Sequence, residues 1–255
     1  MDVSSYGLLA FAVIFGGGML GLLIGKVLHD RYRDDTTQRI VQTTTTMISL
    51  LAALVLGLLV AAAKNRFDIS NKQIEDLAAD LMSLNHDLLK YGPEANDITS
   101  LLREYVVSKI EETWGRGGSR HEPGLPDPPA SQLLENIEEK LLSLAPHSES
   151  QRLMVTRALK ITDDLTMTSW VQTAQAANDI PHPFILILML WLCVLFISFG
   201  LFAPRNAVVV LALLVSALSI ASAVAMIVDM DHPFEGMIVV SAQPMQEALA
   251  RISAP

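Results

Sequence analysis

Four long runs of apolar residues dominate the pattern of hydrophobic and polar positions along the chain. They cover residues 6–28, 40–63, 183–204 and 206–229, and charged residues occur only near their ends. An α-helix advances about 1.5 Å per residue, so roughly 20 apolar residues can cross a hydrocarbon layer of about 30 Å. The pattern therefore predicts an all-α, polytopic membrane protein with four transmembrane helices in a lipid bilayer.

The first of these runs could instead be a cleaved leader peptide. The residues before it, MDVSS, contain no Lys or Arg, and no small-residue cleavage site follows the run. We therefore expect a permanent transmembrane helix. The last two runs are joined only by the residues at 203–206, which predicts a tight antiparallel hairpin.

Residues 64–180 have a different pattern, which predicts a helical, water-facing domain inserted between the second and third spans. Apolar residues recur at steps of three or four from Ile74 to Leu88, the spacing of one helix face. Gly92 and Pro93 end that helix.

Three further helices are expected in the inserted domain, at 96–114, at 131–144 and from Glu149 toward Trp170. Between the first two of them, a segment rich in Gly and Pro at 115–131 predicts a surface loop. After the fourth span, residues 230–255 are expected to form a C-terminal tail.

The distribution of charge excludes some partners and bears on orientation. The net charge is −9, and the acidic residues concentrate in the inserted domain, so no nucleic-acid partner is expected. The connector 26–39 carries four cations and the hairpin adds Arg205. Three cations follow the second span on the opposite side: Lys64, Arg66 and Lys72. Counting positive charges slightly favours a cytoplasmic connector.

Signals of catalysis are absent from the sequence, so we expect neither an enzyme nor a cofactor. The six histidines include no pair at the spacing of a zinc-binding helix, and no phosphate-binding glycine loop occurs outside the spans. No charge lies deep within a span, which disfavours a proton-coupled transporter.

Small residues recur at four-residue intervals in three spans, and such stripes allow the close approach of membrane helices. Two interpretations remain open, which are helix packing within one subunit and packing in a homo-oligomer around a pore. The helix-packing candidates are Gly17, Gly21, Gly25, Ala53, Gly57, Ala61, Ser216 and Ser219.

Two groups of polar residues at span ends are candidates for binding ions. Thr43 and Thr46 belong to a block of threonines at the start of the second span, and their hydroxyls could line a pore or bond to their own helix. Asp229 and Asp231 end the fourth span, where they could bind a regulatory cation or simply mark the membrane surface.

Several sequence pieces resemble a bacterial membrane family that has a bestrophin-like domain. They are the hairpin FGLFAPRN, the D-x-D-x-P-F-x-G block at 229–236, the tail SAQPMQEAL, and upstream LLAALVLGLLVAAAKNRFD and LLREYV. The resemblance implies an oligomeric ion channel of the bacterial inner membrane, with a cytosolic helical domain. The second span has no counterpart of the aromatic and proline-bearing neck of bestrophins, so anion selectivity and bestrophin site residues do not carry over.

Two functions follow as hypotheses. The first is a homo-oligomeric ion channel or pore that conducts inorganic ions, with anions favoured only by the resemblance. The second is a membrane-anchored scaffold whose soluble helices bind a protein partner through an apolar face that contains Leu77, Leu81 and Leu84.

Overall fold

The computed structural model describes residues 3–27, 35–115, 129–176, 182–234 and 236–253. Within these ranges the secondary structure is helical, and no strand occurs. The chain divides into two compact units, which we name the membrane unit (residues 1–67 and 179–238) and the helical unit (residues 68–178 and 239–255).

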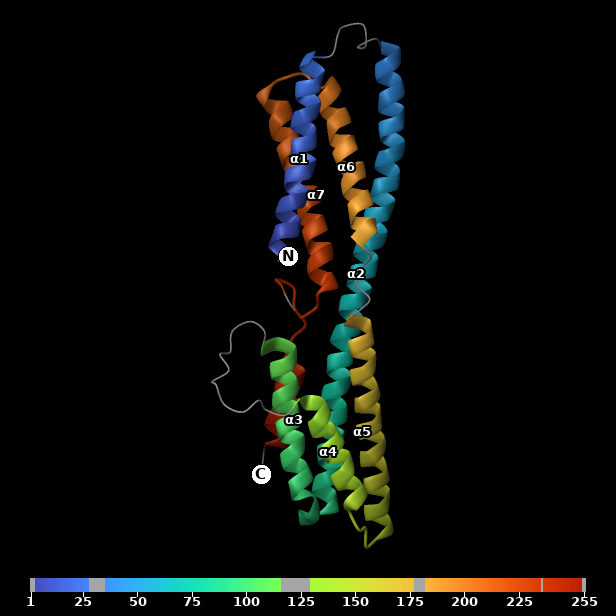
Figure 1. The fold of residues 1–255 in the computed structure, drawn as a ribbon, viewed down its shortest axis with the longest axis vertical. Helices are drawn as coiled ribbons and strands as arrows, with labels where there is room; N and C mark the ends of the chain where they lie inside the picture. The colour runs from blue at the N-terminus through green and yellow to red at the C-terminus, as the bar shows by residue number, and fades with distance from the viewer. Residues whose placement is uncertain (1–2, 28–34, 116–128, 177–181, 235, 254–255) are drawn as a thin grey trace. The chain divides into compact units, whose positions relative to one another are not determined.

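The membrane unit contains the four helices that are long and apolar enough to cross a bilayer. They are α1 (Val3–Val27), the first part of α2 (Asp35–Tyr91), α6 (His182–Phe202) and α7 (Ala207–Asp231) (Figure 1). The predicted fold class, an all-α protein with four membrane-spanning helices, is thereby confirmed.

Helix α2 is a single helix of 57 residues that begins in the membrane unit and continues into the helical unit. The polarity pattern predicts a span at 40–63 and a separate soluble helix after it. The helix continues through this boundary because neither Gly nor Pro occurs between Gly57 and Gly92. The change at Lys64 is therefore one of polarity and not of backbone conformation.

Close packing of α1 against α6 depends on glycines. Gly17 lies against Cys193, and a Cβ atom placed on Gly21 would collide with the backbone carbonyl of Ile197. Likewise, a Cβ atom on Gly200 of α6 would collide with the backbone of α1. Because only glycine permits this backbone separation, these positions fix how closely the two helices approach.

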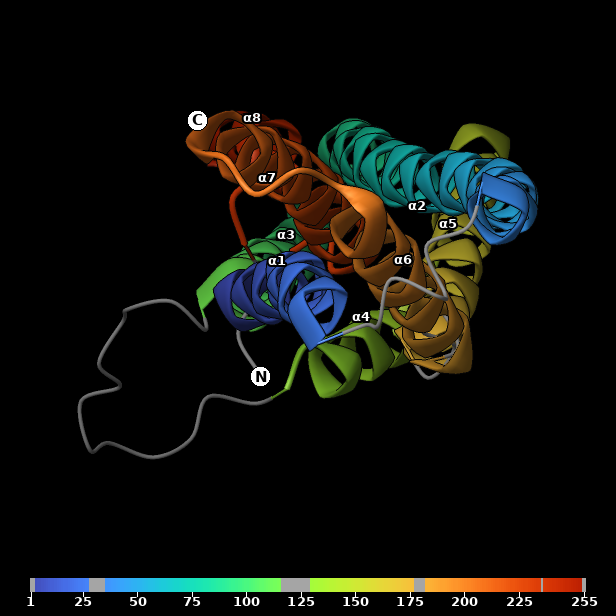
Figure 2. The same cartoon turned by 90° about the horizontal axis from the view of Figure 1, so that it is seen from above.

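Helix α7 packs beside α1 in the same unit (Figure 2). Asn206 caps its start, since the side-chain oxygen accepts a hydrogen bond of 2.8 Å from the backbone amide of Val209. The cap lets the chain turn directly from α6 into α7, as expected for a hairpin. Buried side chains from all four helices form one core, among them Ile14, Leu59, Leu188, Phe196 and Ala217.

The helical unit is built from the second part of α2 and five further elements. These are η2 (Pro93–Ala95), α3 (Asn96–Trp114), α4 (Ala130–Ser143), α5 (Glu149–Ala176) and α8 (Gln243–Ile252). The expected helices at 96–114 and 131–144 agree with α3 and α4 to within one residue. Most of the expected loop 115–131 lies outside the described residues.

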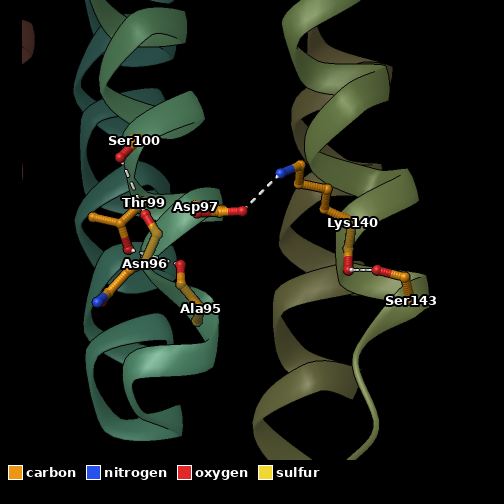
Figure 3. Close-up of polar contacts among 7 residues, drawn as sticks. All are labelled: Ala95, Asn96, Asp97, Thr99, Ser100, Lys140 and Ser143. Carbon is orange, nitrogen blue, oxygen red and sulfur yellow. Dashed lines mark hydrogen bonds and ion pairs between the residues drawn. The ribbon is translucent and has the colours of Figure 1, made fainter.

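Polar contacts join neighbouring helices of this unit at their ends. Lys140 of α4 reaches Asp97 of α3 with an N–O distance of 3.1 Å (Figure 3). Both side chains are exposed, so this ion pair contributes little stability. Glu112 near the end of α3 accepts a hydrogen bond of 2.8 Å from the backbone amide of Ala130, the first residue of α4.

The scaffold hypothesis requires an exposed apolar face on α2, but this face is buried. Leu77, Leu81 and Leu84 are only 4%, 0% and 0% exposed, because they fill the core of the helical unit. The predicted interaction surface is therefore wrong. Its apolar spacing is explained by packing within the chain.

The C-terminal segment 230–255 was predicted to be a tail. Its second half is packed. Helix α8 contacts α3 and buries Met245, Ala248 and Ile252. In addition, the Trp114 indole N–H donates a hydrogen bond of 2.9 Å to the carbonyl of Val240. Residues 239–253 therefore belong to the core of the helical unit.

A carboxylate pair between α2 and α5 makes this unit sensitive to pH. Burial raises the pKa of Asp80 above its ordinary value, and the charges of Asp164 and Asp76 raise it further. A carboxyl group with a raised pKa in the folded state favours folding when it is protonated, and this benefit is lost as pH rises. We expect Asp164→Asn to raise the melting temperature at pH 7 by roughly 1 to 2 °C.

The expected gain from Asp164→Asn should vanish below about pH 4, where carboxyl groups are protonated. Asp163→Asn is the matched control, since Asp163 is exposed and adjacent in sequence but does not contribute to the shift at Asp80. Equal melting temperatures for the two variants at pH 7 would show that general charge reduction, and not this pair, is responsible.

Candidate functional site

The membrane-spanning part of α2 is the least buried of the four spans. Only 17% of its most apolar window is buried inside the chain, against 22% to 33% in the other three. A helix with so much free surface must meet lipid, water or another copy of the protein. The residue types on each face of α2 indicate which of these surroundings that face is suited to.

One face of α2 packs into the core of the membrane unit. Thr45, Ala52, Leu59 and Ala63 are each at most 9% exposed. They recur at steps of seven or four residues, which places them on one side of a helix with about 100° per residue. This face anchors the helix to the core of the membrane unit.

A second face carries small or hydroxyl-bearing residues and a single leucine. It lies roughly 140° around the helix from the buried face, at about 100° per residue. All of its members are exposed, and a Cβ atom on Gly57 would meet no atom within 4 Å. We name this the small-residue face of α2: Thr43, Thr46, Leu50, Ala53, Gly57 and Ala61.

A third face is bulky and apolar. Its members are between 53% and 63% exposed. Large exposed aliphatic side chains at membrane depth are suited to contact with lipid acyl chains. The residues of this face are Ile40, Met47, Leu51, Leu54 and Leu58.

The hydroxyls of the small-residue face bond to their own helix. The Thr43 hydroxyl donates to the carbonyl of Arg39 at 2.9 Å, and the Thr46 hydroxyl donates to that of Gln42 at 2.9 Å. Each hydroxyl proton is thereby used, while the oxygen lone pairs remain able to accept. This geometry suits contact with water or a cation.

The other helix-packing candidates fall into two groups. Gly17, Gly21 and Gly25 of α1 are buried within the membrane unit. Ser216 and Ser219 of α7 are exposed, and the Ser219 hydroxyl donates a hydrogen bond of 2.9 Å to the carbonyl of Val215. The serines therefore share with Ala53, Gly57 and Ala61 a position outside the core of the membrane unit.

The carboxylate of Asp229 organises the turn that follows α7. Asp229 is only 4% exposed. Its two carboxylate oxygens accept hydrogen bonds from the backbone amides of Met237 at 3.0 Å and Ile238 at 2.8 Å. Gly236 permits this turn with a φ of 112°, and a Cβ atom there would collide with the Asp229 carboxylate. This explains the spacing of Asp and Gly in the D-x-D-x-P-F-x-G block.

Asp231 forms an ion pair with Arg66 of α2, with an N–O distance of 2.7 Å. Both candidate carboxylates thus have protein partners. In the part of the chain that the structure describes, no group of three or more His, Cys, Asp or Glu side chains could hold a metal ion. The roles of Arg66 and Gly236 were not predicted, because they depend on contacts between segments distant in sequence or on backbone conformation.

Comparison with known proteins agrees with this architecture. The sequence pattern of one family, described as a bestrophin-like domain, matches residues 12–245. No curated protein matches the chain.

Two crystal structures of point mutants of a bacterial bestrophin homologue from Klebsiella pneumoniae are similar in fold. One has a TM-score of 0.69 at 12% identity and covers 96% of this chain and 97% of that chain. The other has a TM-score of 0.67 at 14% identity and covers 94% and 97%. The family match, which extends over far more than half of the sequence, shows that this chain belongs to the family of proteins with a bestrophin-like domain.

Proposed function

We propose that the protein is a homo-oligomeric ion channel of the cell membrane, in which the small-residue face of α2 lines the conducting path. The helical unit would then lie in the cytosol, as the family resemblance implies. The observation that carries this proposal is the division of α2 into three faces. One face is buried, one is bulky and suited to lipid, and one carries small or hydroxyl-bearing residues together with Leu50.

The small-residue face is poorly suited to a monomer surrounded by lipid. Small side chains offer little apolar area to acyl chains, whereas they leave room for ions and water between neighbouring subunits. The two similar crystal structures are of a bacterial bestrophin homologue, which agrees with membership of a channel family. Subunits arranged around an axis would bring their copies of Thr43 and Thr46 together at one end of the path.

The hydroxyl geometry supports cations as the conducted ion. Because the protons of Thr43 and Thr46 are donated to backbone carbonyls, the oxygens present lone pairs, which attract cations and not anions. The net charge of −9 would also enrich cations near the protein. In planar bilayers with a KCl gradient, we expect a reversal potential near that of potassium and not of chloride.

The double variant Thr43→Val/Thr46→Val tests the lining face directly. Valine preserves the side-chain shape but removes the acceptors, so an ion loses contacts worth about 1 kcal/mol. We expect single-channel conductance to fall about fivefold. The measurement is recording of purified protein in planar bilayers.

Thr44→Val is the matched control. The Thr44 hydroxyl bonds to the carbonyl of Ile40 at 3.0 Å in the same manner, but Thr44 lies off the small-residue face. Its conductance should equal that of the unchanged protein. Equal losses in both variants would contradict the assignment of the face. A monomer in detergent without any conductance would contradict the channel itself and fit a membrane-anchored scaffold.

A further inference from the structure

Two cavities open at the end of the membrane unit where α1 ends and the hairpin between α6 and α7 turns. One has a volume of about 340 Å³ and lies between α1 and the start of α7. The other has a volume of about 460 Å³ and includes Gln38 at the start of α2. Arg205 lines both of them.

The smaller cavity combines a cationic rim with an apolar wall. Lys26 and Arg205 supply two positive charges, one from the end of α1 and one from the hairpin. Both side chains are exposed, and no ion pair joins either of them to a carboxylate among the residues described. The remaining lining is largely aliphatic: Met19, Leu22, Leu23, Ala207 and Val210.

The depth of the cavity in the membrane is set by its position on the helices. Lys26 and Arg205 lie at the ends of membrane spans, where phosphate headgroups are found, while Met19 and Leu22 lie one or two turns further into the apolar run. The first turn of α7 also borders the cavity, and the start of a helix carries partial positive charge.

We infer that this cavity binds an anionic phospholipid, with the phosphate between Lys26 and Arg205 and an acyl chain along Met19 and Leu22. A free phosphate ion would satisfy the two cations but would leave the apolar wall exposed. A lipid satisfies both, and basic pockets between membrane helices are suited to anionic headgroups. The site lies outside the small-residue face of α2 and does not depend on conduction.

Native mass spectrometry of the purified full-length protein tests this proposal. The probes are phosphatidylglycerol and phosphatidylcholine with identical acyl chains, added in equal amounts. We expect retention of phosphatidylglycerol over phosphatidylcholine, and about fivefold weaker retention in Lys26→Gln and in Arg205→Gln. Lys26→Arg should bind as the unchanged protein does.

Arg39→Gln is the control, because it removes one charge from the same side of the spans, at a residue that lines neither cavity. Its retention of phosphatidylglycerol should be unchanged. Equal retention of both lipids by the unchanged protein would overturn the proposal, and this comparison needs no variant to fold. Displacement of the lipid by glycerol phosphate or inorganic phosphate would show a free-anion site and would also overturn it.

Discussion

Gly21→Ala should strongly destabilise the membrane unit. The added Cβ atom would collide with the backbone carbonyl group of Ile197 on α6. Neither partner can turn away, because the Cβ atom is bonded directly to the backbone of α1 and the carbonyl belongs to the backbone of α6. The two helices must separate, and the packing between them is lost along their length. Overpacking of this kind costs about 3 kcal/mol. For a chain of this size, the melting temperature should fall by roughly 6 to 12 °C.

Gly16→Ala is the control from the same helix. A Cβ atom on Gly16 meets no atom within 4 Å, and alanine favours the helix by up to about 1 kcal/mol relative to glycine. Its melting temperature in detergent should equal or exceed that of the unchanged protein. A similar loss of stability in both variants would show that helix flexibility, and not the approach of α1 to α6, is the important property.

Asp229→Ala is expected to produce the second large effect. It should lower the free energy of unfolding by about 3 to 5 kcal/mol. The substitution leaves the backbone amides of Met237 and Ile238 without their acceptor, and hydrogen bonds to a charged group contribute about 1.5 to 3 kcal/mol each. Hydrogen exchange at these two amides should accelerate. The melting temperature should fall in parallel.

Asp229→Asn separates the loss of hydrogen bonds from the loss of volume. Asparagine keeps one side-chain oxygen that can accept, so its stability should lie between that of Asp229→Ala and that of the unchanged protein. Gly236→Ala should act in the same direction as Asp229→Ala, because its Cβ atom would displace the carboxylate. Unchanged exchange at Met237 and Ile238 in Asp229→Ala would refute the role of Asp229 in this turn.

The spans and soluble helices could be predicted because their signals are local. An apolar run of sufficient length has few alternatives to a bilayer, and the limits of α3 and α4 follow from nearby Gly, Pro and Ser residues. The continuity of α2 was missed because a change in polarity at Lys64 resembled an element boundary. The absence of any backbone breaker was the better signal.

The candidate site could be predicted only in part, because it depends on contacts between segments that are distant in sequence. The periodicity of Leu77, Leu81 and Leu84 identifies an apolar face, but only the tertiary structure shows that other helices cover it. In the same way, the spacing of Ala53 and Gly57 identifies a stripe, while its position opposite the buried face of α2 required the structure.

The hydrogen bond between Glu112 and Ala130 has a consequence for how this protein can vary and be engineered. It joins the last turn of α3 to the first turn of α4, so these two helix ends are held together by a direct contact. We therefore expect the packing of α3 against α4 to tolerate changes in the length of the segment that joins them. A fluorescent reporter inserted there should therefore mark which side of the membrane the helical unit occupies, without disturbing the fold that carries it.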